Sequence, residues 1–247
     1  MQRYFLKLAY NGAAYHGWQV QSHNSVTVQQ VLENALSTLL KDFIFLTGCG
    51  RTDAGVHAAV CYAHFETEVP FDEALLVKRM NAFLRKDIIV YNCFKVPNTL
   101  HARFSATYRT YHYHVATRKD PFRKEFVYPV YRAIDFDKMN AAAAVLPEYT
   151  DFSAFTKAQS DTKTNNCNIM KAVWEQTEEQ HVWVFKITAN RFLRNMVRTV
   201  VGTLLEVGYG NISLEEFRSI IESKDRTKAG ATAPAAALFL YDVGYEI

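Results

Sequence analysis

The sequence predicts an α+β fold of two ferredoxin-like halves, each a split βαβ arrangement with an antiparallel or mixed sheet, with a cleft between them. Strand and helix patterns follow one another in the order β-α-β-β-α-β over residues 4–94. A looser version of this order recurs over residues 108–245. A chain of 247 residues is long for one domain and sufficient for two. We therefore expect an N-terminal α+β domain at residues 1–104 and a C-terminal α+β domain at residues 105–247.

The first half contains four strand patterns and two helix patterns. The strands are expected at residues 4–10, 43–46, 58–66 and 88–94. The helices are expected at residues 27–40 and 72–84. Thr27 and Gln30 form a capping box before the first helix, and Asp72 is a capping residue for the second. Asn11-Gly12 is a turn signal that ends the first strand.

The second half is predicted in the same way. Its strands are expected at residues 108–116, 169–176, 182–189 and 238–245. Its helices are expected at residues 137–146, 192–207 and 213–222. Gly208 ends the second of these helices, and Ser213 with Glu216 forms a capping box for the third.

Composition limits the possible functions. The net charge is only +3, so a nucleic-acid surface must be a local basic patch. The four cysteines form no C-x-x-C pair, which is typical of reduced thiols in the cytoplasm. We see no signal peptide, no apolar run long enough to span a membrane and no nucleotide-binding glycine motif. We therefore expect a cytoplasmic protein with no membrane partner and no nucleotide cofactor.

The most informative stretch is the loop Gly48-Cys49-Gly50-Arg51-Thr52-Asp53-Ala54-Gly55-Val56-His57. Its glycines allow positive φ and a close approach of the backbone to a ligand. Asp53 is its only acid, and Arg51 lies two residues before it. Such an aspartate can simply cap the backbone of its own turn. It can also be a nucleophilic carboxylate held beside a guanidinium, and the spacing leaves both interpretations open.

Five segments, in order, resemble the motifs of the tRNA pseudouridine synthase A family. The first is Tyr15-His16-Gly17-Trp18-Gln19 with Thr27-Val28-Gln29, and the second is the Asp53 loop. The others are listed in chain order: His101 to Thr107 with Tyr111 and Tyr113, Phe192-Leu193 with Met196-Val197-Arg198 and Gly202, and Ala233-Pro234-Ala235 with Leu238 and Leu240. One position departs from the pattern, because Ala237 stands where the family usually has glycine.

The resemblance implies a pseudouridine synthase fold, a homodimer and an enzyme that isomerises uridine to pseudouridine at positions 38 to 40 in the anticodon arm of tRNA. It implies that Asp53 is the nucleophile, and attack on either the base or the sugar is compatible with the motif. Arg51 would contact the extruded nucleotide or its phosphate. Tyr111 would stack on the uracil and help to remove the C5 proton, and Arg198 would pair with the catalytic carboxylate.

Further arginines are candidate RNA contacts. Arg191 and Arg194 recur with Arg198 along the expected helix at residues 192–207, and we expect the first two to contact phosphates. Arg109 shares a strand face with Tyr111, whereas Tyr113 is expected to pack in the core. With His101, Arg103, Arg118 and Lys119, Arg109 is expected to form one basic zone between the halves.

Two other function classes compete with this interpretation, and two side-chain sets raise the question of a metal. A non-catalytic RNA-binding module could use the same basic surface with aromatic side chains. A glycoside or nucleoside hydrolase would need a second carboxylate, and the nearest candidates after the loop, Glu66 and Glu68, lie at the far end of the next strand. A metal site could involve His112 with His114 or the sequence neighbours Cys49, His57 and Cys61. H-x-H alternation is commonplace on a strand, and the three-residue set has no recognised ligand spacing, so we expect no metal.

Overall fold

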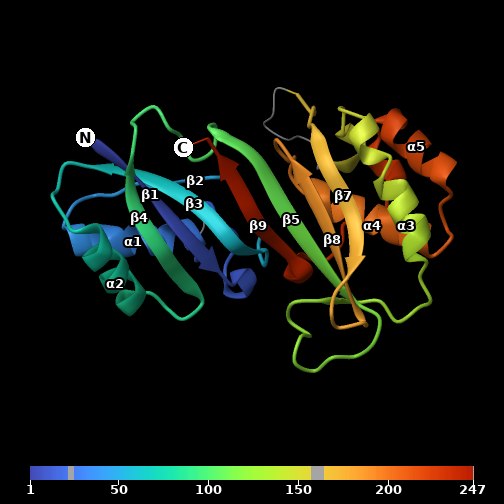
Figure 1. Ribbon diagram of the computed structural model, residues 1–247, viewed down its shortest axis with the longest axis horizontal. Coiled ribbons are helices and arrows are strands. Elements are labelled where there is room, and N and C mark those ends of the chain that lie inside the picture. Colours follow the sequence, from blue (N-terminus) through green and yellow to red (C-terminus); the bar gives the residue numbers. More distant parts are fainter. Residues whose placement is uncertain (22–24, 157–163, 247) are drawn as a thin grey trace. The chain divides into compact units, whose positions relative to one another are not determined.

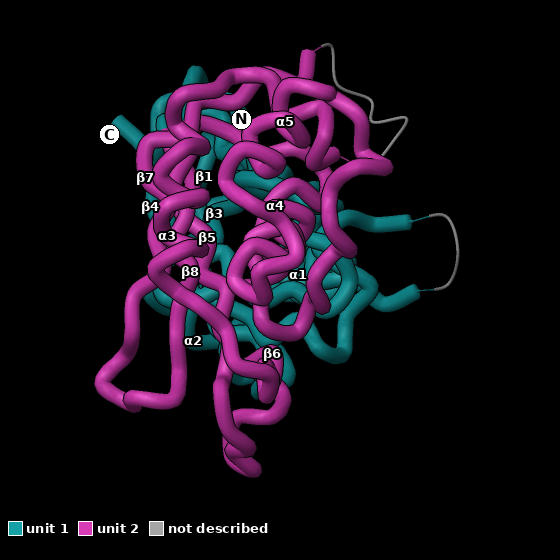
Figure 2. Tube along the Cα trace, turned by 90° about the vertical axis from the view of Figure 1, so that its right-hand side faces the viewer, with its two compact units in different colours: residues 1–107, 239–247 teal, residues 108–238 magenta. Residues whose placement is uncertain are grey.

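The computed structural model describes residues 1–21, 25–156 and 164–246 of the chain. The chain forms two compact units. Unit 1 contains Met1–Thr107 and Phe239–Ile247, and unit 2 contains Tyr108–Leu238 (Figure 2). The fold is α+β in class, with both parallel and antiparallel strand pairs.

The described part of unit 1 contains a mixed sheet and two α-helices (Figure 1). Its elements are β1 (Gln2–Tyr10), α1 (Val28–Leu40), β2 (Thr47–Gly48), β3 (His57–Thr67), α2 (Glu73–Phe83), β4 (Ile88–Val96) and β9 (Leu238–Tyr245). The strands lie in the order β4–β1–β3–β9, and β2 pairs with β3. β1 runs antiparallel to both β3 and β4, whereas β9 runs parallel to β3.

Both helices of unit 1 begin where their capping residues predict. The Thr27 hydroxyl accepts a hydrogen bond from the Gln30 N–H at 3.3 Å, and the Asp72 carboxylate accepts one from the Leu75 N–H at 2.7 Å. Each cap satisfies a backbone donor that has no partner within its helix. Apolar residues of α1 then pack into the core at helical spacing: Val28, Leu32, Ala35, Leu36 and Leu40.

The strand expected at residues 43–46 is wrong. The alternation is real, because Ile44 and Leu46 are buried while Phe43 and Phe45 are 88% and 79% exposed. However, side chains of α1 satisfy the buried residues' backbone donors. Ile44 N–H donates to the Ser37 hydroxyl at 3.0 Å, and Leu46 N–H donates to the Glu33 carboxylate at 2.8 Å. The segment therefore docks on a helix, and β2 begins only at residue 47.

Unit 2 is built on an antiparallel sheet (Figure 1). Its elements are β5 (Ala106–Ala116), β6 (Tyr128–Pro129), α3 (Phe136–Ala143), β7 (Ile169–Gln176), β8 (Val182–Ala189), α4 (Met196–Gly208) and α5 (Leu214–Ser223). β8 lies between β5 and β7, and the short β6 pairs in parallel with β5. The capping box of Ser213 and Glu216 is confirmed at the start of α5.

The expected C-terminal domain, residues 105–247, differs from unit 2 at its last strand. β9 pairs with β3, with His57 opposite Phe239 and Ala58 opposite Leu240. Residues from Phe239 onward accordingly belong to unit 1. The partner of a strand is a non-local choice that its own alternation does not encode.

Three histidines are largely removed from solvent inside the two units, which makes the stability of the fold depend on pH. Burial, the main cause, lowers the pKa of His64, His112 and His114 to about 4. In an unfolded chain a histidine titrates near pH 6.5. Between these two pKa values the unfolded state binds more protons than the folded state, so acid favours unfolding.

We therefore expect the contribution of these histidines to the free energy of unfolding to be complete above pH 6.5. It should be lost progressively as the pH falls toward 4. At pH 5 the loss should be on the order of 1–2 kcal/mol for each histidine, after allowance for partial exposure. Urea unfolding at pH 7 and pH 5 measures it. His112→Phe removes one titrating group, so the difference between the two pH values should shrink. An unfolding free energy that is constant across this range would contradict the prediction.

Candidate active site

The Asp53 loop forms a tight turn between β2 and β3. The Val56 N–H donates to the Asp53 carbonyl at 3.1 Å, and Gly55 takes a φ of +78° that favours glycine. Arg51 is exposed, whereas the Asp53 side chain is half-buried. The carboxylate is thus partly shielded from water but remains accessible, as a nucleophile must be.

The segment that follows β1 holds this loop in place. The Trp18 N–H donates to the Thr52 carbonyl at 3.2 Å, and the Gly55 N–H donates to the Tyr15 carbonyl at 3.3 Å. The hydroxyls of Tyr10 and Thr52 share a hydrogen bond at 2.9 Å. These contacts fix the backbone on both sides of Asp53, so the carboxylate is attached to a rigid turn.

Two glycines in the segment after β1 allow its backbone to approach the backbone of the Asp53 loop closely. A Cβ at Gly12 would overlap the Val56 carbonyl oxygen. Gly17 has a φ of +91°, and a Cβ there would lie 2.6 Å from the Thr52 carbonyl oxygen. The sequence alone marks Asn11-Gly12 only as the end of a strand. No periodic pattern marks a glycine whose purpose is contact with a distant backbone.

The glycines of the loop itself play different parts. Of the three expected to take positive φ, only Gly55 does so. Gly48 instead leaves room for Trp18, because a Cβ there would overlap the indole. Trp18 is 2% exposed, so it packs in the core of unit 1 and is not a binding surface.

Tyr15 connects the loop support to the rest of unit 1. Its hydroxyl donates to the Asp87 carboxylate at 2.7 Å, and the Asp87 carbonyl accepts from the Asn11 N–H at 2.8 Å. Burial, followed by the bond to Asp87, raises the pKa of the Tyr15 phenol. Tyr15 and Asp87 are therefore positioning residues, and the sequence does not reveal them because no local pattern links two residues so far apart.

The acids that a hydrolase would need are engaged elsewhere in unit 1. Glu66 accepts from Arg3 Nε at 3.0 Å and forms an ion pair with that guanidinium. Glu68 lies 3.2 Å from the N-terminal ammonium group. Neither carboxylate belongs to the turn that carries Asp53, so neither is placed as the second acid that a glycosidase needs.

All four cysteines are buried free thiols. The Sγ atoms of Cys49 and Cys61 lie 3.5 Å apart. The nearby His57 directs Nδ1 elsewhere, since it accepts a hydrogen bond from the Gly12 N–H at 3.0 Å. His57 also stacks on Phe239, with 4.6 Å between the ring centroids. Within the described chain, these three residues behave as packing groups.

In unit 2, β5 presents Tyr111 and Tyr113 on one face, with different surroundings. Tyr113 is fully buried, and burial raises the pKa of its phenol. Tyr111 is half-buried, and its ring meets Phe192 edge-on at a centroid distance of 5.1 Å. Tyr113 is thus a core residue, as expected, whereas Tyr111 has an oriented ring that can still reach a ligand.

Arg109, on the same strand, donates from Nη1 to the Asn190 carbonyl at 2.8 Å. Asn190 also accepts at its side-chain oxygen from the Asn168 N–H at 2.8 Å. Arg109 therefore anchors the segment between β8 and α4, which carries two of the other candidate arginines.

The expected helix at residues 192–207 begins later, at Met196. Asn195 has a φ of +64°, and this left-handed residue separates Arg191 and Arg194 from the helix. The three arginines therefore do not form one helical stripe. Arg194 is exposed and Arg191 is half-buried. Leu193 continues the buried apolar pattern through the non-helical segment, which is why periodicity placed the helix start too early.

Arg198 lies in the first turn of α4 and binds the segment that precedes β9. Its Nε donates to the Ala233 carbonyl at 2.7 Å, and the Ala233 N–H donates to the Arg198 carbonyl at 3.0 Å. One turn later, a Cβ at Gly202 would overlap the Ala231 carbonyl oxygen. Two motifs far apart in sequence are thus joined, and the Arg198 guanidinium is held at its Nε edge.

The chain is similar to known proteins over nearly its whole length. The family model described as tRNA pseudouridine synthase matches residues 149–246. The tRNA pseudouridine synthase A of Parabacteroides distasonis is 52% identical over 246 residues, which are 99% of this chain and 96% of that protein. The enzyme of the same name from Porphyromonas gingivalis is 49% identical over 99% of this chain and 98% of its own length. The chain belongs to the tRNA pseudouridine synthase A family.

More distant relatives and solved structures add less. A tRNA pseudouridine synthase A from a Thermoanaerobacter species is 38% identical over 99% of this chain and 100% of its own length. A solved structure of Thermus thermophilus Cse3 bound to RNA is 10% identical, with a TM-score of 0.21 over 84% of this chain and 97% of that one. That score supports no conclusion.

Membership of the tRNA pseudouridine synthase A family decides between the alternatives left by the sequence. It assigns an isomerase family in place of a hydrolase or a non-catalytic binding module. The departure at Ala237 is accommodated, because this residue is buried in the short 3-10 helix Ala235–Ala237 and does not take a positive φ. No helix among the described residues is long and apolar enough to cross a membrane.

Proposed function

We propose that the protein isomerises uridine to pseudouridine at positions 38 to 40 in the anticodon arm of tRNA, with Asp53 as the nucleophile. The observation that carries this proposal is full-length membership of the tRNA pseudouridine synthase A family, together with a half-buried Asp53 on a rigid turn. We further propose a cytoplasmic homodimer whose two units are ferredoxin-like halves, as the family resemblance implies.

The reaction is balanced without a cofactor. The N1–C1′ glycosidic bond breaks, the uracil turns, and a C5–C1′ bond forms. C5 loses its proton and N1 gains one, so no electron, water molecule or phosphate is consumed. A carboxylate that adds covalently to the base or the sugar separates bond cleavage from bond formation. Asp53 supplies that carboxylate, and the fixed turn spares the enzyme the cost of ordering it.

Three residues complete the proposed site. Arg51 is exposed two residues before Asp53, where it can contact the extruded nucleotide or the phosphate beside it. Tyr111, oriented by Phe192, stacks on the uracil and helps to remove the C5 proton. Arg198, held at its Nε by Ala233, pairs with the Asp53 carboxylate through its other nitrogens.

The remaining arginines serve RNA binding in two ways. Arg194 is exposed outside the helix and is proposed to contact phosphate directly. Arg191 is half-buried and is proposed to make a shorter-reaching contact from the same segment. Arg109 is proposed to position Arg191 and Arg194, because its hydrogen bond to the Asn190 carbonyl fixes the segment that carries them.

The test is tritium release from tRNA labelled at C5 of uridine, followed by mapping of pseudouridine in the product. We expect release that is equal to the pseudouridine formed, confined to the anticodon arm and unaffected by EDTA. Tight binding of tRNA without release by a folded sample would support the non-catalytic RNA-binding module instead. Release that maps outside the anticodon arm would overturn the proposed substrate position.

Tyr111→Phe separates two roles of the tyrosine. If the hydroxyl takes part in removing the C5 proton, we expect turnover to fall by about 10²-fold or more while tRNA affinity stays nearly constant. The phenylalanine ring keeps the edge-on contact with Phe192, so the fold is preserved. Single-turnover tritium release at saturating enzyme measures the effect, and circular dichroism checks the fold. A loss below about threefold would leave stacking as the only role of the ring.

A further inference from the structure

The loop between β5 and β6, residues 117–127, has an unusual combination of side chains, and we call it the β5–β6 loop. Figure 1 shows it extending beyond the end of β5, beside the turn between β7 and β8. Phe122 in this loop is 93% exposed. Four basic residues surround it in sequence: Arg118, Lys119, Arg123 and Lys124. An aromatic ring this exposed adds little to the core, and its face is open to a partner beside these cations.

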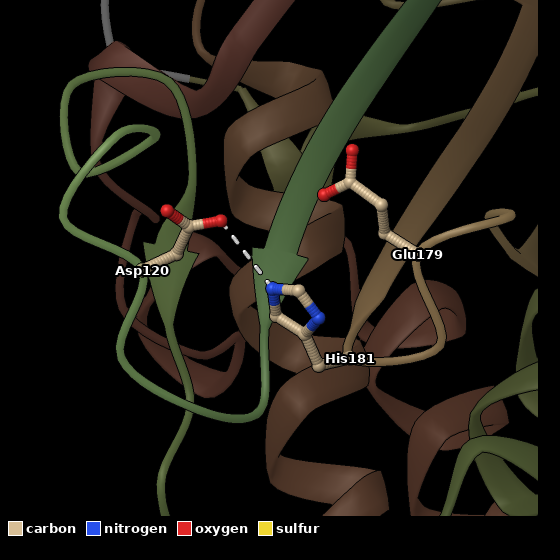
Figure 3. Close-up of side chains that lie close together, drawn as sticks. All are labelled: Asp120, Glu179 and His181. Atoms are coloured by element: carbon tan, nitrogen blue, oxygen red, sulfur yellow. Dashed lines mark hydrogen bonds and ion pairs between the residues drawn. The ribbon is translucent and has the colours of Figure 1, made fainter.

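A hydrogen bond and an ion pair fasten this loop to the turn between β7 and β8. The Asp120 carboxylate lies 3.4 Å from His181 Nε2, and the dashed line in Figure 3 marks this contact. Arg123 pairs with Glu179 of the same turn. The loop also has its own backbone restraints, since the Phe122 N–H donates to the Asp120 carboxylate at 2.9 Å. The loop is therefore ordered before it meets a partner, which lowers the entropic cost of binding.

The side chains of Asp120, Glu179 and His181 also suggest a metal site, and Figure 3 shows them together. Their ligating atoms lie within 4.8 Å of one another. However, the Arg123 guanidinium already pairs with Glu179, and it would repel a cation placed beside that carboxylate. We therefore interpret the cluster as a structural fastening of the loop.

The contacts with the turn between β7 and β8 occupy two carboxylates and leave basic side chains of the loop exposed to solvent. Asp120 is hydrogen-bonded to His181, and the facing Glu179 is paired with Arg123. In contrast, Arg118, Lys119 and Lys124 are exposed and have no ion pair within the described parts of the chain. Exposed cations flanking an aromatic ring are typical of proteins that bind single-stranded nucleic acid, where phosphates meet the cations and a base stacks on the ring.

This surface is separate from the candidate site residues of unit 2. Arg109 lies near the start of β5 and Ala116 at its end, and that length of strand spans roughly 23 Å at about 3.3 Å per residue. The β5–β6 loop begins after Ala116. The basic zone expected to combine Arg109 with Arg118 and Lys119 is therefore two separate surfaces at opposite ends of the strand.

We propose that the β5–β6 loop is a second tRNA-binding surface, at which Arg118, Lys119 and Lys124 contact phosphates and an unpaired base stacks on Phe122. The proposal rests on the proposed function, because it takes the tRNA substrate as the RNA. It adds a contact outside the reaction site that increases affinity and leaves the chemical step unchanged.

The charge contribution is tested with two matched triple variants. One carries Arg118→Ala, Lys119→Ala and Lys124→Ala. The control carries Lys78→Ala, Arg79→Ala and Lys86→Ala, which remove the same number of exposed cations of the same types at and just beyond α2. Equilibrium binding of tRNA is measured from 50 to 300 mM KCl. The loop variant should lose about two units of salt slope, at roughly 0.7–0.9 per phosphate, and the control almost none.

The stacking contribution is tested with Phe122→Ala, Phe122→Tyr and the control Phe43→Ala, which removes another fully exposed phenyl ring. We expect Phe122→Ala to weaken tRNA binding about tenfold. Phe122→Tyr should retain wild-type affinity, and Phe43→Ala should resemble the wild type. For the loop triple variant and for Phe122→Ala, KM should rise while kcat at saturating tRNA stays constant. A structural role would instead lower thermal stability and kcat together.

The outcomes distinguish this inference from the proposed function. If the wild-type protein forms no pseudouridine in tRNA, the proposed function fails. If it does, and the loop triple variant and Phe122→Ala bind tRNA like their controls, the β5–β6 loop is not an RNA-binding surface. Equal losses of tRNA affinity and salt slope in the loop and control triple variants would likewise overturn the inference. They would show that binding depends on the net charge of the protein and not on this loop.

Discussion

Asp53→Asn should reduce pseudouridine formation by at least about 10⁴-fold, which is the scale of loss when an essential nucleophile is removed. The amide is nearly isosteric with the carboxylate but cannot add to the base or the sugar. The turn should survive, because it is closed through the Asp53 carbonyl and supported by backbone bonds to Thr52 and Gly55. Tritium release under single-turnover conditions measures the loss.

Affinity for tRNA should remain within about threefold of the wild type in the same variant, since phosphate contacts and stacking supply most of the binding. Asp42→Asn is a suitable control, because it makes the same change at an exposed position of unit 1. Mass spectrometry must exclude deamidation of the introduced asparagine back to aspartate. An intact asparagine variant that keeps more than a few per cent of wild-type turnover would remove Asp53 from the role of nucleophile.

Local signals in the sequence predicted the elements they belong to. The caps at Thr27 and Asp72 and the capping box at Ser213 lie where three helices begin. The hairpin of β7 and β8 has the predicted bounds, because strand alternation and a polar turn define it completely. Each of these features depends on residues within a few positions of one another.

Features that depend on distant residues were predicted less well. Residues 43–46 alternate like a strand, but Ser37 and Glu33 of α1 satisfy their backbone. β9 pairs in parallel with β3, a partner that its own alternation does not specify. The start of α4 is set by the left-handed Asn195, although the apolar period continues before it. In each case a tertiary contact decided among local structures that the pattern allowed.

The candidate site shows the same division. The family motifs supplied Asp53, Tyr111 and Arg198 as candidates, but not the contacts that hold them. Gly12 and Gly17 are needed for the backbone of the Asp53 loop to approach its support. The bond between Arg198 and Ala233 joins two motifs that are separate in the chain. Such contacts specify geometry through shape and hydrogen bonding, and single-residue motifs do not encode them.

Arg198→Ala and Arg194→Ala should have different effects, even though only a few residues separate them. Arg198→Ala removes the hydrogen bond to the Ala233 carbonyl, at a cost of roughly 1.5–3 kcal/mol of stability for a charged donor. It also removes the proposed partner of the Asp53 carboxylate, so turnover should fall by about 10²- to 10³-fold. The salt dependence of tRNA binding should hardly change, because no phosphate contact is lost.

Arg194→Ala should do the opposite. Arg194 is exposed and precedes the left-handed Asn195, so its loss leaves α4 intact. We expect weaker tRNA binding, a salt slope lower by about one unit, and nearly normal turnover at saturating tRNA. Arg198→Lys adds a control, since it keeps the positive charge but loses the fork that can serve Ala233 and a carboxylate together.

The measurements are salt titrations of tRNA binding, saturating-substrate rates and urea unfolding on all three variants. Arg198→Lys should be as stable as Arg198→Ala or slightly more stable, and it should recover only a small part of the turnover. If Arg198→Ala instead loses salt slope and keeps its kcat, as Arg194→Ala is expected to do, Arg198 is an RNA contact. The carboxylate of Asp53 would then need a different partner, because a guanidinium engaged with phosphate cannot also stabilise the nucleophile.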